Sequence, residues 1–270
     1  MTPLIRFFAV LITALAAAAG VAGADDGILP KTPAGIPSAL KGLQLEAGHG
    51  REQLDKSYYT DWLNTYVTAE NRLDSGVVVY GTARQVERYS LTDQEYLLGS
   101  YLPVAERTFL LVEGNMSPAY NVLPRWSTLL ELNRLFDGGW GGGIGVRRTE
   151  YSMTQFWMGI ARIERYLGPW YGSYTLRQVS VDTVGDASSH SLKLSYYYGG
   201  KSFAGAGYSI GRELESAGTA GTLVSDITEY LIAGRHWLSE QWGMSWEAGS
   251  HMQGAYYTRR WISIGIRREF

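Results

Sequence analysis

From Leu43 to the end of the chain, apolar and polar side chains alternate in segments of about ten residues, and turn residues separate these segments. A period of two is typical of β-strands, and repeated segments of this length are typical of strands that cross an outer membrane. The segments lie near 42–49, 58–72, 76–88, 93–102, 108–115, 125–136, 140–148, 153–165, 170–181, 190–198, 202–212, 226–238, 241–250 and 256–270. The pattern predicts an all-β fold, a closed antiparallel transmembrane β-barrel of about 14 strands, with 12 strands as the alternative.

The segment 190–198 shows how the two faces of such a barrel would differ. Its even positions from 192 to 198 carry Leu, Leu, Tyr and Tyr, whereas the odd positions between them carry Lys, Ser and Tyr. A soluble β-sandwich would alternate in the same way, so alternation alone leaves both folds open. The 19 Tyr and 9 Trp favour the membrane, because these rings collect where a barrel meets the lipid headgroups.

The connections between the segments alternate in length. Short ones fall near 73–75, 103–107, 137–139, 166–169, 199–201 and 239–240, and longer ones fall near 116–124, 182–189 and 213–225. Bacterial barrels have short periplasmic turns and longer outer loops, so this order predicts that both ends of the barrel domain face the periplasm. The connections near Tyr89 and Thr149 are shorter than this rule prefers, which keeps the 12-stranded alternative open.

The first 24 residues have the layout of a secretory signal peptide, because Arg6 precedes an apolar run that ends in the small-residue cleavage site 22–24. The following stretch carries three prolines without periodicity and predicts an extended periplasmic leader, with a plug inside the barrel as the alternative. The expected domains are therefore a signal peptide (1–24), a leader (25–41) and an outer-membrane β-barrel (42–270).

The chain ends on Phe270, which closes a segment with Ile264 and Ile266 on the same parity. A terminal aromatic residue after such a segment resembles the signal that the barrel-assembly machinery recognises. Phe270, Ile266 and Ile264 are therefore the expected assembly signal. Arg268 departs from this pattern, although its long side chain can reach the headgroup region. The expected location is the bacterial outer membrane, with its lipids and the barrel-assembly machinery as partners.

Three parts of the chain resemble the YaiO family of outer-membrane β-barrel proteins. They are the early segment from Leu45 to His49, the run from Arg162 to Tyr166 before a Gly-Pro turn, and the closing run from Trp261 to Phe270. The resemblance implies a barrel fold and an outer-membrane location. It implies no activity and no catalytic residues.

Charge and composition exclude several function classes. The 24 Lys and Arg residues nearly balance the 26 Asp and Glu residues, so no surface for nucleic acid is expected. The absence of Cys excludes disulfides, thiolate metal sites and Cys nucleophiles. The four His residues are too scattered for a metal site, and the glycines of 138–143 lack the Lys and Ser/Thr of a phosphate loop. We therefore expect no metal and no cofactor.

A lipid-modifying enzyme would need a nucleophile beside a base, and His190 with Ser191 is the candidate pair, with Asp182 or Asp186 in the preceding loop. Adjacent residues of a strand point to opposite faces of the sheet, so this pair is poorly placed to share a proton. No catalytic residue is assigned, and a barrel without enzymatic activity is favoured.

The polar parity of the segments would place charges of both signs in the lumen. The expected lumen-lining residues are Glu113, Glu131, Arg147, Arg162, Arg177, Lys193, Glu229, Arg235, Glu247 and Arg259. Such charges would set the selectivity of a porin-like conduit that exports or takes up a polysaccharide or a small polar solute. The alternative is a structural or surface-interaction barrel in which the charges pair and fill the lumen.

The assembly signal makes the first prediction. Deletion of Phe270 leaves Glu269 at the end of the chain and removes the hydrophobic anchor, so less protein should reach the outer membrane, whereas export across the inner membrane should continue. Cell fractionation of tagged chains with and without Phe270 measures both steps. Equal amounts of heat-modifiable barrel in the outer membrane would show that the terminal aromatic residue is not the signal.

Overall fold

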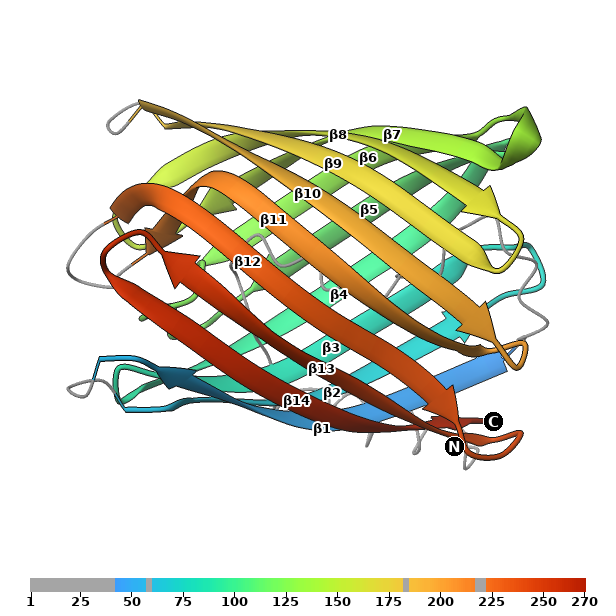
Figure 1. The fold of residues 1–270 in the computed structure, drawn as a ribbon, viewed down its shortest axis with the longest axis horizontal. Coiled ribbons are helices and arrows are strands. Elements are labelled where there is room, and N and C mark those ends of the chain that lie inside the picture. Colours follow the sequence, from blue (N-terminus) through green and yellow to red (C-terminus); the bar gives the residue numbers. More distant parts are fainter. Residues whose placement is uncertain (1–41, 57–59, 182–184, 217–221) are drawn as a thin grey trace, which may run out of the picture.

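A computed structural model describes residues 42–56, 60–181, 185–216 and 222–270, and the expected signal peptide and leader lie outside them. The described chain forms one closed antiparallel sheet of 14 strands (Figure 1), so the 12-stranded alternative is wrong. The strands are β1 (Gly42–Leu54), β2 (Trp62–Arg72), β3 (Val78–Arg88), β4 (Leu91–Ala105), β5 (Thr108–Met116), β6 (Trp126–Leu135), β7 (Trp140–Glu150), β8 (Gln155–Leu167), β9 (Trp170–Val181), β10 (Gly185–Tyr198), β11 (Ser202–Ser216), β12 (Thr222–Trp237), β13 (Trp242–Gln253) and β14 (Tyr257–Glu269). A short 3-10 helix, η1 (Asp137–Gly139), joins β6 to β7. Within the described residues, no helix is long and apolar enough to cross a membrane.

Each strand pairs with its neighbours in the chain, and β1 pairs with β14 to close the barrel. Glu46 lies opposite Arg267 across this seam, and Gly50 lies opposite Ser263. Gly42 and Phe270, the first and last residues of the barrel, therefore lie at the same end. We call it the terminal end; it is on the right in Figure 1. The opposite end, which carries the connection between β5 and β6, is called the loop end.

Tight turns explain why 14 strands fit where two connections looked too short. Tyr89 and Ser90 join β3 to β4 with φ angles of 54° and 61°. Positive φ at both central residues is the geometry of a two-residue hairpin, whose twist matches that of the flanking strands. The second connection, between β7 and β8, is the four-residue turn 151–154, which a hydrogen bond from the Tyr151 N–H to the Thr154 carbonyl closes at 2.8 Å. A short connection at the loop end is therefore compatible with a complete pair of strands.

Two predicted connections are wrong in part. The stretch 213–225 was expected to be a loop, but β11 runs to Ser216 and β12 begins at Thr222. The stretch 182–189 was expected to be a loop, but β10 already begins at Gly185, and Asp182 lies outside the described residues. Ala187 and Ser189 face inward and are buried, so the alternation of β10 continues to its start. Small residues there weaken the sequence signal of a strand without preventing strand pairing with β9.

The outer surface of the barrel carries a belt of exposed aliphatic side chains. Leu194, Ile144 and Ile266 are 52%, 67% and 60% exposed, and similar residues occur on the outward parity of most strands. An apolar surface of this extent would be a liability in water but is the surface required in a bilayer. The inward parity of the same strands carries Glu, Arg, Ser and Thr, so the polar face is the inner one and the β-sandwich alternative does not apply.

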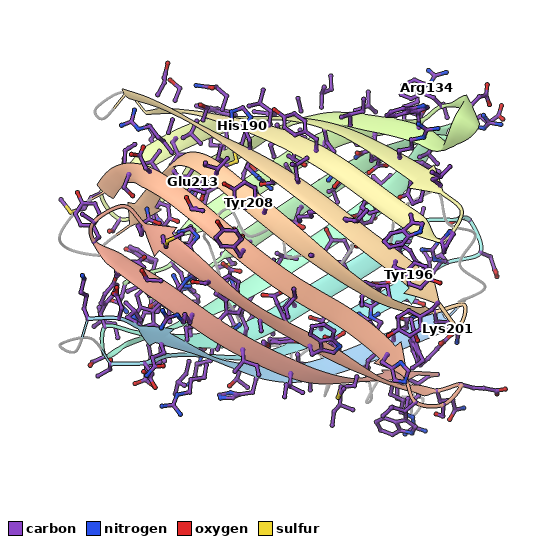
Figure 2. All side chains as sticks on the ribbon, viewed as in Figure 1. Arg134, His190, Tyr196, Lys201, Tyr208 and Glu213 are labelled. Atoms are coloured by element: carbon purple, nitrogen blue, oxygen red, sulfur yellow. The ribbon has the colours of Figure 1, made fainter. Side chains whose placement is uncertain are left out.

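Aromatic rings mark the terminal end of this belt. Trp140, Trp170 and Trp242 stand at the starts of β7, β9 and β13, and all three are exposed. Tyr196 lies near the same end, close to Lys201, whereas Glu213 lies nearer to the loop end (Figure 2). Rings with one apolar and one polar edge favour the headgroup region, so these residues define an interfacial girdle.

The expected assembly signal lies on the outer surface at this girdle. Phe270 is 58% exposed, and its backbone N–H donates to the carbonyl of Leu43 at 2.9 Å, which continues the seam to the last residue. The guanidinium of Arg268 lies 4.6 Å from the ring centre of Phe270 and 5.1 Å from that of Trp242. Arg268, which departs from the aromatic pattern, thus places its cation beside two aromatic rings at the membrane edge, where cation–π contacts are favourable.

The division of faces predicts a strong position effect in β10. Leu194→Arg puts a charge in the apolar belt and should lower the free energy of unfolding by about 2–4 kcal/mol, whereas Leu194→Phe should leave it close to the wild-type value. Urea unfolding in lipid vesicles measures both variants. Equal stability of the two variants would show that position 194 does not face lipid.

Candidate functional site

All the charged residues expected in the lumen occupy the inward parity of their strands. They come from nine strands, β5 to β10 and β12 to β14, so they surround the lumen rather than gather on one wall. Most of them have a partner from another strand, and two of these pairs, Glu113 with Arg147 and Glu131 with Arg162, link strands that are not neighbours. The polar side chains in the lumen therefore contact one another, and their ion pairs and hydrogen bonds form several groups.

The first group lies at the seam between β1 and β14. Arg267 Nε donates to Glu46 Oε2 at 2.7 Å, and Arg267 Nη1 donates to Gln44 Oε1 at 2.6 Å. The other carboxylate oxygen of Glu46 accepts from the hydroxyls of Ser245 at 2.6 Å and Tyr66 at 2.9 Å. Glu46 and Arg267 are both buried, so this ion pair has nearly all its hydrogen-bonding groups satisfied within the protein.

A second group crosses from β3 to β7. Glu113 accepts hydrogen bonds from the Tyr80 hydroxyl at 2.6 Å and from Arg147 Nη2 at 3.3 Å. Glu95 lies beside it, pairing with Arg84 at 3.4 Å. The two carboxylates are thus matched by two guanidinium groups, and the group offers donors and acceptors without a large net charge.

Two further groups complete the walls. Arg162 bridges Glu131, Asn133 and Glu164 on the side of β6 and β8. Arg177 donates to Ser191 at 2.8 Å on the side of β9 and β10.

The remaining predicted residues also lie on the inward face. Glu229 Oε2 lies 3.0 Å from His251 Nδ1, and Glu247 accepts from the indole N–H of Trp261 at 2.7 Å. Arg259 donates to Glu52 at 3.0 Å, which forms a second ion pair across the β1 and β14 seam. Lys193 lies on the inward parity of β10, and the Arg235 guanidinium lies 5.8 Å from the ring centre of Phe203.

Sequence reasoning missed Asp93, a fully buried carboxylate on the inward face of β4. It accepts hydrogen bonds from the backbone N–H groups of Asn121, Val122 and Leu123 at 2.7 to 3.0 Å, and from the Asn121 side-chain amide at 2.8 Å. Leu123 is completely buried and packs with Val86. The connection 117–125 is therefore folded inward over the loop end and is held there by the Asp93 carboxylate and by the packing of Leu123 on Val86.

Sequence reasoning also missed an apolar strip inside the lumen. Phe156, Met158 and Ile160 occupy successive inward positions of β8, and Val179 of β9 packs with them. The signal was present, because both parities of 156–161 are apolar or small, which departs from the simple rule of a polar interior. At the level of this strip, the lumen has an apolar wall on β8 and β9 and a charged wall on β1, β3 to β5 and β14.

Between these walls lies a cavity of about 310 Å³, formed by the halves of the strands nearest the loop end. Its lining includes Glu52, Arg84, Glu95, Glu113, Arg147, Arg259, Phe156, Met158 and Ile160. Pro124 of the inward-folded connection also lines it. The space is large enough for a small polar molecule or several waters.

The structure does not bring the candidate catalytic pair together. His190 is on the outer face, where its Nδ1 lies 2.7 Å from the hydroxyl of Tyr174, and it is exposed (Figure 2). Ser191 is on the inner face with Arg177. Among the described residues, no group of three or more His, Asp or Glu side chains is arranged to hold a metal ion.

A closed antiparallel sheet with an apolar outer belt and a charged interior defines an integral outer-membrane β-barrel protein. The model of the YaiO membrane beta barrel domain matches residues 43–215, more than half of the chain. The chain therefore belongs to the YaiO family, and its location is the bacterial outer membrane. The match includes the runs from Leu45 to His49 and from Arg162 to Tyr166, whereas the closing run from Trp261 lies beyond it.

Solved structures share this fold at low sequence identity. The CymD monoaromatic hydrocarbon channel has a TM-score of 0.60 and 10% identity, with 94% of each chain covered. A bacterial polysaccharide outer membrane secretin has a TM-score of 0.52 and 9% identity, with 85% of this chain and 99% of that chain covered. No curated protein matches the chain in sequence.

The seam pair predicts a difference between buried and exposed ion pairs. Arg267→Gln leaves the Glu46 carboxylate buried without its cation and should lower the free energy of unfolding by roughly 3–5 kcal/mol. Removing both charges together, with Glu46→Gln and Arg267→Gln, should cost less. Urea unfolding in vesicles compares these variants with Arg107→Gln, which breaks an exposed pair and should leave stability near the wild-type value. Equal effects at the buried and exposed pairs would contradict the assignment.

Proposed function

We propose that this barrel is a conduit that takes up or exports a polar, saccharide-like solute across the outer membrane. The observation that carries the proposal is the cavity of about 310 Å³ between charged and apolar walls within the closed sheet. A barrel that served only as a scaffold would need no such space. The polar wall replaces part of the hydration of a passing solute, which lowers the cost of removing it from water.

The pairing of the charges favours a solute without strong net charge. Glu113 with Arg147 and Glu52 with Arg259 present donors and acceptors side by side, so neither sign dominates the field in the cavity. Sugar hydroxyls both donate and accept hydrogen bonds, and the apolar faces of sugar rings suit a wall such as Phe156 and Met158. The hydrocarbon channel and the polysaccharide secretin show that barrels of this fold are used for transport, although at 9% to 10% identity they share the fold alone.

A second candidate function is a structural or surface-interaction barrel with a filled lumen. Two observations favour it: the ion pairs satisfy one another, and Asp93 holds the connection 117–125 over the loop end. Under this proposal the cavity holds water and conducts nothing.

Single-channel recording in planar bilayers separates the two functions. A conduit should give stepwise conductance, and Arg147→Gln should shift the reversal potential in a salt gradient toward cation selectivity, because it removes a positive charge from the cavity wall. The matched control is Arg134→Gln, which changes an exposed Arg at the terminal end and should leave the reversal potential unchanged. Entry of neutral oligosaccharides into vesicles then tests the solute class. A folded, heat-modifiable barrel that gives no conductance steps would favour the filled lumen.

A further inference from the structure

Arg148 lies on the outward face of β7, two residues before the strand ends at the loop end. Its guanidinium lies 5.4 Å from the ring centre of Trp126 and 5.2 Å from that of Trp157, so it sits between two indole rings. Its Nη2 donates to the side-chain oxygen of Gln155 at 3.0 Å. These contacts hold a cation in one place on the surface that faces lipid.

The protein provides little to balance this charge. The nearest outward-facing carboxylate on β7, Glu150, pairs with Arg125 at 3.1 Å. No carboxylate among the described residues forms an ion pair with Arg148, whose only side-chain hydrogen-bond acceptor among them is the neutral Gln155. A cation at the membrane surface is costly unless an anion or water balances it, and a guanidinium group is well suited to bind an oxyanion.

An apolar groove lies next to this cation. It has a volume of about 680 Å³ and is lined on the outward side by Tyr96, Leu98, Gly114, Met116, Trp126 and Thr128. Thr128 is the cross-strand partner of Arg148, so the edge of the groove adjoins the guanidinium. Gly114 forms the floor, since a Cβ there would have its nearest neighbour, the carbonyl oxygen of Ser127, at 3.9 Å. The groove is thus a depression over Gly114, bordered by the rings of Tyr96 and Trp126.

We propose that this surface binds one anionic membrane lipid, with its phosphate on Arg148 and one acyl chain in the groove over Gly114. The cation and the groove match the two parts of such a lipid, and both lie on the face that the membrane covers. Guanidinium groups bind phosphate oxygens through several hydrogen bonds, and the indole rings beside Arg148 belong at the headgroup level. This site is on the outer wall and is independent of conduction through the lumen.

The test uses the full-length mature barrel in detergent and native mass spectrometry of retained lipid. Phosphatidylglycerol and phosphatidylcholine with the same acyl chains are the two probes. The wild-type barrel should retain one phosphatidylglycerol in preference to phosphatidylcholine. Arg148→Gln should reduce the retention of phosphatidylglycerol about tenfold, the factor expected for the loss of a charge-assisted hydrogen bond. Gly114→Leu fills the groove and should reduce the retention of both lipids.

Arg165→Gln is the matched control, because Arg165 also lies on the outward face and stacks on a tryptophan, Trp140, at 4.6 Å, but at the terminal end of β8. It should retain phosphatidylglycerol as the wild type does. Heat modifiability in gels confirms that each variant is folded. The proposal is overturned if the wild type retains both lipids equally, if folded Arg148→Gln retains as much phosphatidylglycerol as the wild type, or if Arg165→Gln loses as much as Arg148→Gln.

Discussion

The backbone of a strand in a bilayer has no water to bind, so the whole structure depends on the pairing of β1 with β14. This seam runs from Gln44 opposite Glu269 to Leu54 opposite Arg259, and the hydrogen bond from Phe270 to Leu43 extends it. Without it, two strands would expose unpaired N–H and C=O groups to lipid. The long registers of the other 13 strand pairs have a stable environment only because the sheet closes on itself.

The seam also determines where its charges meet. Opposite residues of an antiparallel pair alternate between hydrogen-bonded and non-hydrogen-bonded pairs, and side chains lie closer together in the second kind. Leu43 and Phe270 face outward and form a hydrogen-bonded pair. The inward-facing pair of Glu46 and Arg267 is therefore a non-hydrogen-bonded one. Closure of the sheet and formation of this ion pair are therefore coupled. The lumen owes its polar interior to strand register, and the same alternation supplies the apolar outer belt and the position of Arg148 beside the groove.

Alternation and turn residues were sufficient to predict the number of strands. They also predicted that Leu194 of β10 faces outward and Ser195 inward. Both features depend on residues that are neighbours along the chain. They could not predict that Glu113 of β5 meets Arg147 of β7, since contact across an intervening strand depends on the curvature of the barrel. Asp93 was missed for a related reason: its partners are backbone N–H groups in a connection about 30 residues away, and backbone groups leave no mark in the sequence.

Closure of the barrel can be measured directly, because the chain contains no Cys. An added Cβ on Gly50 would lie 3.2 Å from that of Ser263, a few tenths of an ångström shorter than the spacing of about 3.5–4.5 Å in disulfides. The double variant Gly50→Cys with Ser263→Cys should form this disulfide in the assembled outer-membrane protein, as shown by a shift in non-reducing gels. The control, Gly50→Cys with Ile262→Cys, places the second thiol on the outer face and should stay reduced. Failure of the first pair to cross-link in a folded barrel, or equal cross-linking of both pairs, would contradict the closed seam.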